Sequence, residues 1–178
     1  MCNDRELDLT KREADVSIRP YDPNATDLEQ IFLYERTLKL FASKKYLENV
    51  GTPHKLEDLD THRFVIFNES STTIQNIQSA NWILTLGMRP GQKREPSIKV
   101  NSAECLAYAA QEGLGIIALS NDSLLIEKHN LSSILPSVQG PCSQVCYTYP
   151  TSVKNLQIIK LFGKYLKEVF TPKAYQKP

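Results

Sequence analysis

The chain lacks the excess of basic residues that nucleic-acid-binding domains usually carry. Its 178 residues include 21 Lys and Arg against 20 Asp and Glu, which leaves a formal net charge of +1. It also lacks any apolar run near the roughly 20 residues that a membrane-spanning helix needs. We therefore expect that this chain contacts no membrane and does not itself read DNA.

Cysteine is scarce, and its spacing argues against a common metal site. The four cysteines, Cys2, Cys105, Cys142 and Cys146, form no CxxC pair and lack zinc-ligand spacing. Because we find no signal peptide, we interpret them as reduced thiols and expect a cytoplasmic protein. Cys105 stands beside Leu106 in a helical pattern, which predicts a small buried hydrophobic residue.

The usual catalytic motifs are missing as well. The sequence contains no GxGxxG, P-loop, HExxH or GxSxG. The three histidines, His54, His62 and His129, are far apart in sequence, and no third group is placed to orient one of them beside a cysteine nucleophile. We predict that the chain is not an enzyme and holds neither a metal nor a cofactor.

What is present is a regular alternation of elements. Hydrophobic residues make up 41% of the chain, enough to bury a core. Predicted strands and helices follow one another, which favours an α/β fold with a mostly parallel sheet. The expected strands are residues 15–19, 31–42, 63–67, 97–100, 116–119 and 144–149. The expected helices are residues 3–14, 43–51, 103–112, 124–135 and 155–170.

The last of these helices has the clearest amphipathic pattern. Apolar residues recur on one face at helical spacing, and lysines occupy much of the rest. We interpret the lysines as a solvated face with favourable charge near the C-terminal end of the helix. The residues predicted to share the apolar face are Ile158, Phe162, Tyr165, Leu166 and Val169.

The most informative segment is VNSAECLAYAAQEGLGIIALSND, residues 100–122. Asn101 is placed to cap its helix, and Glu104 follows three residues later, which is the capping-box pattern. The helix therefore begins, with free backbone N–H groups, at the C-terminal end of a strand. Ligands bind at that edge of open α/β sheets, and helix N-termini favour anions. The segment predicts part of a ligand pocket with no catalytic group beside it.

Four stretches together carry a resemblance to a known family. They are RELDLTKREADVSIR, LKLFASKKYLENVGTPHKLEDLDTHRFV, VNSAECLAYAAQEGLGIIALSNDSL and YTYPTSVKNLQIIKLFGKYLKEVF. In order and spacing they resemble the effector-binding (substrate-binding-like) domain of LysR-type transcriptional regulators, and they span nearly the whole chain.

The resemblance implies an α/β fold of two Rossmann-like subdomains joined by two crossover strands, as in type 2 periplasmic binding proteins. Mapped onto this sequence, subdomain I comprises residues 1–34 and 146–178, and subdomain II comprises residues 35–145. The family's N-terminal winged helix-turn-helix has no counterpart here, nor has the first strand–helix–strand of subdomain I. The resemblance thus implies a fragment with an incomplete first subdomain, which would meet DNA only through the absent N-terminal domain.

The resemblance also implies a sensing function. A small-molecule effector would bind between the subdomains and control DNA binding by the full-length protein, which would be a homodimer or tetramer. Helix N-termini favour an anionic effector, and Arg19, at the end of a strand, is suited to clamp a carboxylate. The residues expected to contact the effector are Asn3, Asp4, Arg19, Pro20, Tyr21, Ser43, Asn101, Ser102 and Ala103.

Several alternatives stay open at this point. The residues at helix starts can be caps only, and Arg19 can form a surface ion pair with Asp22 or Glu35. The chain can be a two-lobe solute-binding protein with no role in DNA binding. It can also be an inert truncated fragment that pairs with a neighbour through an exposed strand edge.

Overall fold

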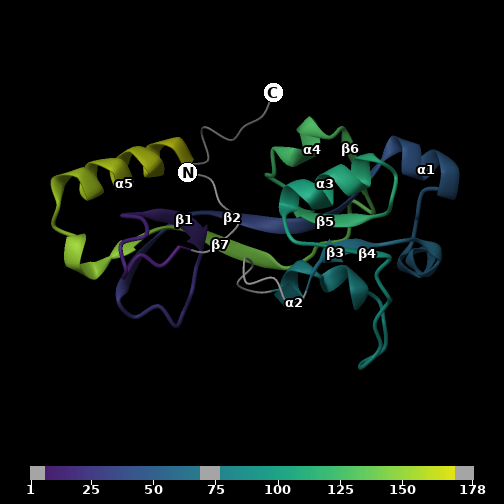
Figure 1. Cartoon of the computed structure of the whole chain (residues 1–178), viewed down its shortest axis with the longest axis horizontal. Helices are drawn as coiled ribbons and strands as arrows, with labels where there is room; N and C mark the ends of the chain where they lie inside the picture. The colour runs from purple at the N-terminus through teal and green to yellow at the C-terminus, as the bar shows by residue number, and fades with distance from the viewer. Residues whose placement is uncertain (1–6, 69–76, 171–178) are drawn as a thin grey trace. The chain divides into compact units, whose positions relative to one another are not determined.

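The computed structural model describes residues 7–68 and 77–170 (Figure 1). These residues form two compact units, which we describe separately. Unit 1 comprises the described residues of 37–141, and unit 2 comprises 7–36 and 142–170. The limits expected for subdomains I and II stay a prediction.

The longest strand, β2 (Leu28–Ser43), belongs to both units. Its residues up to Arg36 lie in unit 2, and the rest lie in unit 1. Aromatic and aliphatic residues dominate the segment, as is usual for a strand that packs on neighbours. The strand predicted over residues 31–42 is therefore confirmed and is longer at its N-terminal end.

In unit 1, β2 pairs antiparallel with both β5 (Ile117–Ser120) and β6 (Leu131–Ile134). A parallel pair joins β3 (Val65–Phe67) to β4 (Ile98–Val100), and a parallel bridge links Phe64 to Ile116. The remaining elements of unit 1 are α1 (Lys44–Val50), η1 (Leu56–Thr61), α2 (Ile77–Ala80), η2 (Trp82–Leu84), α3 (Ala103–Gln111) and α4 (Leu125–Lys128).

Successive residues of the unit 1 strands supply two different apolar clusters, because strand side chains alternate between faces. Leu40 and Ile116 belong to one cluster, in which α1, η1 and η2 also pack. Phe41 and Ile117 belong to the other, which α3 covers. Trp82 is buried in the first cluster. Burial on both faces explains why these short strands are almost continuously apolar.

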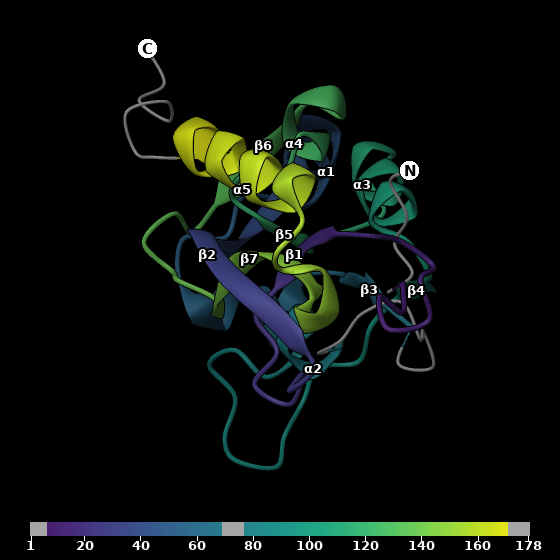
Figure 2. The ribbon, with the colours of Figure 1, turned by 90° about the vertical axis from the view of Figure 1, so that its left-hand side faces the viewer.

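Unit 2 is a sheet of three strands with a helix on one face. Its order is β1 (Ser17–Pro20), β7 (Cys142–Pro150) and then β2, and β1 runs antiparallel to β7. After η3 (Thr151–Val153), the chain forms α5 (Gln157–Phe170), which packs over this sheet (Figure 2).

Tyr147 is the centre of the contact between α5 and the sheet of unit 2. Its side chain is fully buried, and its hydroxyl donates a hydrogen bond to the carbonyl of Ile159 at 3.2 Å. Gly163 lies over the same ring, where an added Cβ would come within 2.9 Å of it. The absence of a side chain at Gly163 therefore lets α5 approach the sheet.

Two expected helices are wrong in part. Residues 7–14 form turns, because the Asp8 carboxylate accepts hydrogen bonds from the N–H groups of Thr10 and Lys11 in place of a helical pattern. The hydrogen bond from the Thr10 hydroxyl, followed by those from the backbone N–H groups of Lys11 and Thr10, lowers the pKa of Asp8 to about 2. The predicted helix over 124–135 ends with α4, because Asn130 adopts a φ of 50° and the chain then forms β6.

The expected mostly parallel sheet is also wrong for the described ladders. Alternation of strands and helices suggested crossover connections throughout, but β2 and β7 are long strands whose neighbours β1, β5 and β6 run in the opposite direction. Parallel pairing joins β3 to β4, and a parallel bridge joins Phe64 to Ile116.

Two predictions about buried faces fail as well. Cys105 is exposed, because the buried face of α3 is formed by Leu106 and the alanines that follow it. In α5 the buried residues are Ile159, Gly163 and Leu166, and only Leu166 belongs to the predicted face.

None of the helices described in the two units is long and apolar enough to cross a bilayer.

Candidate functional site

The start of α3 is the best-formed of the predicted site positions. Ser102 has an extended backbone, and its hydroxyl accepts a hydrogen bond from the N–H of Cys105 at 3.2 Å. Ser102 is therefore the cap, and the expectation that Asn101 caps the helix is wrong. Asn101 is exposed one residue before the cap, so its amide is not needed to cap the start of the helix.

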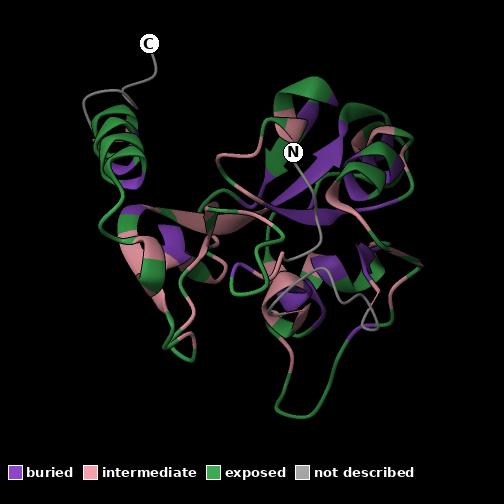
Figure 3. Ribbon diagram, turned by 60° about the vertical axis from the view of Figure 1, so that its left-hand side comes forward, coloured by how far each residue is buried: buried purple, intermediate pink, exposed green. Residues whose placement is uncertain are grey.

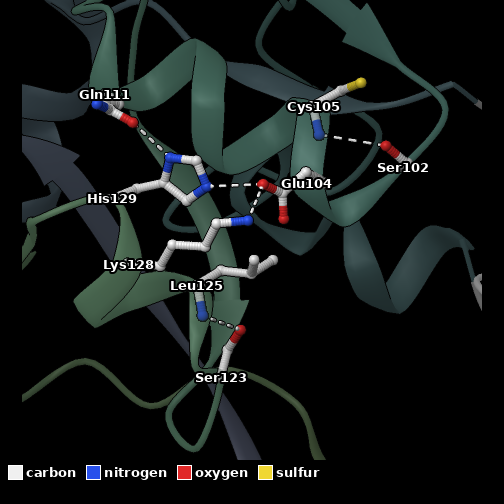
Figure 4. Close-up of polar contacts among 8 residues, drawn as sticks. All are labelled: Ser102, Glu104, Cys105, Gln111, Ser123, Leu125, Lys128 and His129. Atoms are coloured by element: carbon white, nitrogen blue, oxygen red, sulfur yellow. Dashed lines mark hydrogen bonds and ion pairs between the residues drawn. The ribbon is translucent and has the colours of Figure 1, made fainter. Parts of the chain in front are cut away.

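Glu104 does not complete a capping box but reaches to α4 (Figure 4). Its carboxylate is 2.5 Å from the ammonium of Lys128 and 3.1 Å from Nε2 of His129. Lys128 most strongly, and then His129, hold the pKa of Glu104 below its usual value. A negative charge stands in the first turn of α3, where the helix dipole favours it, and a lysine balances it.

His129 contacts both ends of α3. Its side chain is 6% exposed, and its two ring nitrogens lie against Glu104 in the first turn and Gln111 in the last (Figure 4). Because a carboxylate can only accept, Nε2 is the donor to Glu104. Tyr108 meets the imidazole edge-on, with ring centroids 6.5 Å apart. The residue that ends α4 thus sets the position of α3.

Sequence reasoning missed this role of His129. A usable signal was present, because Glu104 and Gln111 are seven residues apart and therefore share one face of the helix. A polar pair at that spacing, on a helix that is otherwise apolar toward the core, indicates a buried polar partner from another segment.

The segment GLG after α3 fixes the start of β5. Gly113 has a φ of 78°, a left-handed backbone that ends the helix. Gly115 passes so close to Arg63 that an added Cβ would lie 2.6 Å from its carbonyl oxygen. The Ile116 N–H donates to the same oxygen at 2.8 Å. The close approach of Gly115 is therefore part of the backbone pairing between residues 63–64 and Ile116. The pattern therefore serves the backbone geometry of α3 and β5.

Ser43 caps α1. Its side chain is buried, and its hydroxyl accepts a hydrogen bond from the N–H of Tyr46 at 3.3 Å. Gly51 ends the helix with a φ of 101°, so both predicted ends of this element are confirmed. The capping contact supports the alternative that Ser43 is structural, and its contact with an effector stays a prediction.

The remaining predicted residues fall in unit 2 or outside the described residues. Arg19 and Pro20 are half-buried at the end of β1, and Tyr21, which follows, is 51% exposed. The Tyr21 N–H donates to the carbonyl of Gln144 at 2.8 Å, which anchors this end of the strand. Asn3 and Asp4 lie outside the described residues.

Each unit has a hollow among its described residues, and the predicted residues line neither of these two. One, of about 250 Å³ in unit 1, is lined by Asp60, His62, Phe64, Met88, Arg94 and Glu95. The other, of about 580 Å³ in unit 2, is lined mainly by residues 9–15, 26–27 and 150–156. Within the described ranges there is no group of three or more His, Cys, Asp or Glu side chains suited to a metal ion.

An ion pair between two of its lining residues, Arg94 and Asp60, forms part of the wall of the hollow of unit 1. The guanidinium of Arg94 is buried and bonds Asp60 through Nε at 2.8 Å and Nη2 at 2.7 Å. Its Nη1 also donates to the carbonyls of Ile83, in η2, and Leu86, just after η2. These bonds hold the loop that contains Arg94 against η2. Burial of the neighbouring His62 lowers the pKa of its imidazole. These contacts explain the polar residues here without a ligand.

Comparison with known proteins adds the family. The sequence profile of the LysR substrate binding domain matches residues 3–171. The chain is 27% identical over 154 residues to an uncharacterized HTH-type transcriptional regulator of Haemophilus influenzae. The aligned region covers 83% of this chain and 50% of that protein. The chain therefore spans about half the length of this curated relative.

Solved structures show the same fold. The regulatory domain of CrgA, a LysR-type transcriptional regulator from Neisseria meningitidis, is similar with a TM-score of 0.73 at 23% identity, over 92% of this chain and 78% of that one. The effector domain of AmpR from Pseudomonas aeruginosa gives a TM-score of 0.71 at 14% identity, over 97% and 80%. The periplasmic-binding-protein-like α/β fold expected from the sequence is confirmed.

Proposed function

Because this chain belongs to the LysR substrate-binding domain family, we propose that it is the effector-sensing part of a bacterial LysR-type transcriptional regulator. In this proposal it binds a small molecule, catalyses no reaction and works in the cytoplasm. DNA is read by a helix-turn-helix segment of a longer protein, which acts as a homodimer or tetramer. The family match and the name of the Haemophilus relative as an HTH-type regulator support this function.

The start of α3 is the proposed effector contact in unit 1. Its first turn presents backbone N–H groups and the positive end of the helix dipole, which favour an anion. Asn101 adds an exposed amide beside the cap Ser102. The nearby carboxylate of Glu104 is balanced by Lys128, so its repulsion of an anion is reduced. The observation that carries the proposal is this capped helix start with an adjacent amide that the cap does not use.

Arg19, Pro20 and Tyr21 form the second group of proposed contacts, in unit 2. A guanidinium binds a carboxylate through two parallel hydrogen bonds, and an exposed tyrosine ring covers an apolar portion of a ligand. These residues can be tested separately from α3 because they belong to another unit.

The test is a thermal-shift screen of this chain with carboxylate and phosphate metabolites. We expect at least one compound to raise the melting temperature, since a ligand that binds the folded state stabilises it. Asn101→Ala should then weaken binding by about tenfold, which is the cost of one hydrogen bond to a charged group. Asn24→Ala, at an exposed position of unit 2, is the matched control and should leave binding unchanged.

Two outcomes would count against the proposal. In the first, no metabolite shifts the melting temperature of either this chain or a longer form of the protein. In the second, Asn101→Ala, Arg19→Gln and Asn24→Ala all bind the compound equally, which would place the effector elsewhere.

A further inference from the structure

The hydroxyl of Tyr46 is a buried junction of three segments in unit 1. Figure 3 shows buried residues along the strands and on one side of the helices, and Tyr46 of α1 is one of them, at 1% exposed. Its hydroxyl accepts a hydrogen bond from the N–H of Arg63, shortly before β3, at 2.8 Å. Nδ1 of His62, the residue that ends η1, lies 3.1 Å from the same oxygen. One side chain thus joins α1 to the end of η1 and to the segment that enters β3.

The contact between Tyr46 and His62 is complete only when the imidazole is neutral. Tyr46 has one hydroxyl proton to donate, and Nδ1 of the neutral ring accepts it. A charged imidazole carries a proton on both nitrogens, so Nδ1 can then only donate, and the Tyr46 O–H loses this acceptor. A buried hydroxyl that loses its acceptor is unfavourable. The geometry therefore favours a neutral His62 with its proton on Nε2.

The surroundings of Tyr46 act in the same direction. Burial lowers the pKa of His62, and the charge of Asp58 opposes this effect more weakly. The guanidinium of Arg63 lies over the Tyr46 ring, 5.5 Å from its centroid, where it repels a second positive charge. The neutral ring thus stabilises the fold at pH values above the ordinary histidine pKa. That stabilisation is lost as the pH falls through the lowered pKa.

The hollow of unit 1 offers negatively charged partners to a protonated His62. The imidazole is half-buried and lines this hollow together with Asp60 and Glu95. Arg94 bonds Asp60 through two nitrogens, but both of them contact Oδ1, so Arg94 does not use Oδ2. Two carboxylates against one guanidinium give the wall a net negative charge. A charged imidazole is therefore favoured in the hollow and disfavoured against Tyr46.

We propose that the contact between Tyr46 and His62 is a pH-sensitive switch in unit 1. The neutral ring of His62 accepts the Tyr46 hydroxyl proton and holds the end of η1 on α1. On taking up one proton from solvent, the ring leaves Tyr46 and turns to the carboxylates of Asp60 and Glu95. Histidine is the side chain suited to such a change between about pH 5 and pH 8.

The opening is confined to the segment around His62. Leu59 is fully buried in the apolar cluster that also contains Tyr46, so it keeps the middle of η1 in place in both states. The start of β3 is held as well, because the Val65 N–H donates to the carbonyl of Ile116 at 3.0 Å. The residues that become free to move are therefore 60–63.

Amide hydrogen exchange of this chain, expressed as protection factors from about pH 8 to about pH 5, tests the inference. The N–H groups of His62 and Arg63 are the reporters, because both are bonded within the segment that opens. We expect their protection to fall about tenfold at the acidic end, as for the loss of one hydrogen bond. The N–H of Gly51, at the other end of α1, should keep its protection.

Two variants separate the contact from the charge. His62→Asn offers an amide oxygen to the Tyr46 hydroxyl and cannot take up a proton, so protection should stay high throughout the pH range. Tyr46→Phe removes the hydroxyl, so protection should be low throughout. The matched controls are His54→Asn, at an exposed histidine, and Tyr149→Phe, at a buried tyrosine of unit 2. Both controls should open like the unmodified chain, and circular dichroism checks that each variant is folded.

A third variant tests where the charged ring goes. Glu95→Gln removes one carboxylate from the hollow, which weakens the open state, so the midpoint of opening should move to lower pH. Glu48→Gln, at an exposed glutamate of α1 that does not line the hollow, is its control and should leave the midpoint unchanged.

The switch is separate from the proposed effector contact at the start of α3. His62→Asn should leave the metabolite-induced thermal shift at pH 7 unchanged, so that failure of one proposal can be told from failure of the other.

Three results would overturn the inference. Protection of the His62 and Arg63 amides that does not change between about pH 8 and about pH 5 would mean that the ring does not control this segment. Opening that persists in His62→Asn would mean that another group takes up the proton. An equal loss of protection at Gly51 would mean that acid destabilises the whole unit and not this contact.

Discussion

The carboxylate of Glu104 accepts a hydrogen bond from Nε2 of His129 at 3.1 Å, and this contact joins the first turn of α3 to the end of α4. The imidazole is buried and its other nitrogen lies against Gln111, so one side chain holds both ends of a helix. The position of α3, whose start is the proposed effector contact, therefore depends on a residue that lies outside α3.

We predict that His129→Ala destabilises the chain. The substitution leaves the Gln111 amide and the Glu104 carboxylate without this partner and removes a buried ring. The free energy of unfolding should fall by about 2 kcal/mol, as for other losses of buried hydrogen-bonding groups. Urea denaturation at pH 7 measures it. His54→Ala, at an exposed histidine, is the control and should cost less than about 0.5 kcal/mol. Equal costs would contradict the role of His129.

A second prediction concerns the pH dependence of the Glu104 contact. Lys128 and His129 lower the pKa of Glu104 in the folded state, so its ionised form stabilises folding at pH values above the usual glutamate pKa. This stabilisation is lost as the pH falls through the lowered pKa. Glu104→Gln should therefore reduce the melting temperature at pH 7, and the difference from the unmodified chain should disappear at acidic pH.

The Glu104 effect should be small and sensitive to salt, because the carboxylate is exposed. Glu57→Gln, at another exposed glutamate, is the control and should show no such pH-dependent difference. A Glu104→Gln difference that persists unchanged into acid would mean that ionisation of Glu104 is not its cause.

A third prediction compares the two glycines after α3. Gly115→Ala would push a Cβ against the Arg63 carbonyl at 2.6 Å, where the backbone is held by the Ile116 N–H. We expect a loss of about 2–3 kcal/mol, typical of overpacking. Gly113→Ala has space but must keep a φ of 78°, which costs about 1–2 kcal/mol. Chemical denaturation should give this order, and the reverse order would refute the account of the close approach.

A fourth prediction concerns Arg94. Lysine cannot bond Asp60 through two nitrogens while also reaching the Leu86 carbonyl, as the guanidinium does. Arg94→Lys should lower the free energy of unfolding by about 2 kcal/mol. Arg89→Lys, at an exposed position of the same loop, should be nearly neutral. A neutral Arg94→Lys would show that the ion pair contributes little.

Elements with strong local signals could be predicted from the sequence. The helix after Ser43 begins and ends where its cap and Gly51 indicate, and α3 lies within one residue of its predicted range. The family's fold also followed, because four segments in one order are more specific than any one of them. These signals depend on neighbouring residues and need no tertiary contact.

The predictions failed where contacts between residues far apart in the sequence determine the local structure. The residues after α4 have helical spacing, yet Leu131 and Ile134 are buried as strand residues against β2. The apolar arc of α5 is wider than the face that it buries, so the pattern alone could not indicate which half faces Tyr147. The contact of His129 with α3 joins positions 25 residues apart, so the spacing of Glu104 and Gln111 could indicate a polar partner but not which residue supplies it.

The thiols of the described residues are divided between the units in a way that suits labelling. Cys105 is exposed in unit 1 and Cys142 in unit 2, whereas Cys146 is buried and burial raises the pKa of its thiol. Because the thiolate is the reactive form, maleimide reagents should react with the two exposed cysteines first. A variant in which only Cys2 is replaced by serine thus carries one exposed attachment point for a spin label or fluorophore on each unit. The distance between the two labels, recorded with and without a candidate effector, would measure how the units respond to it.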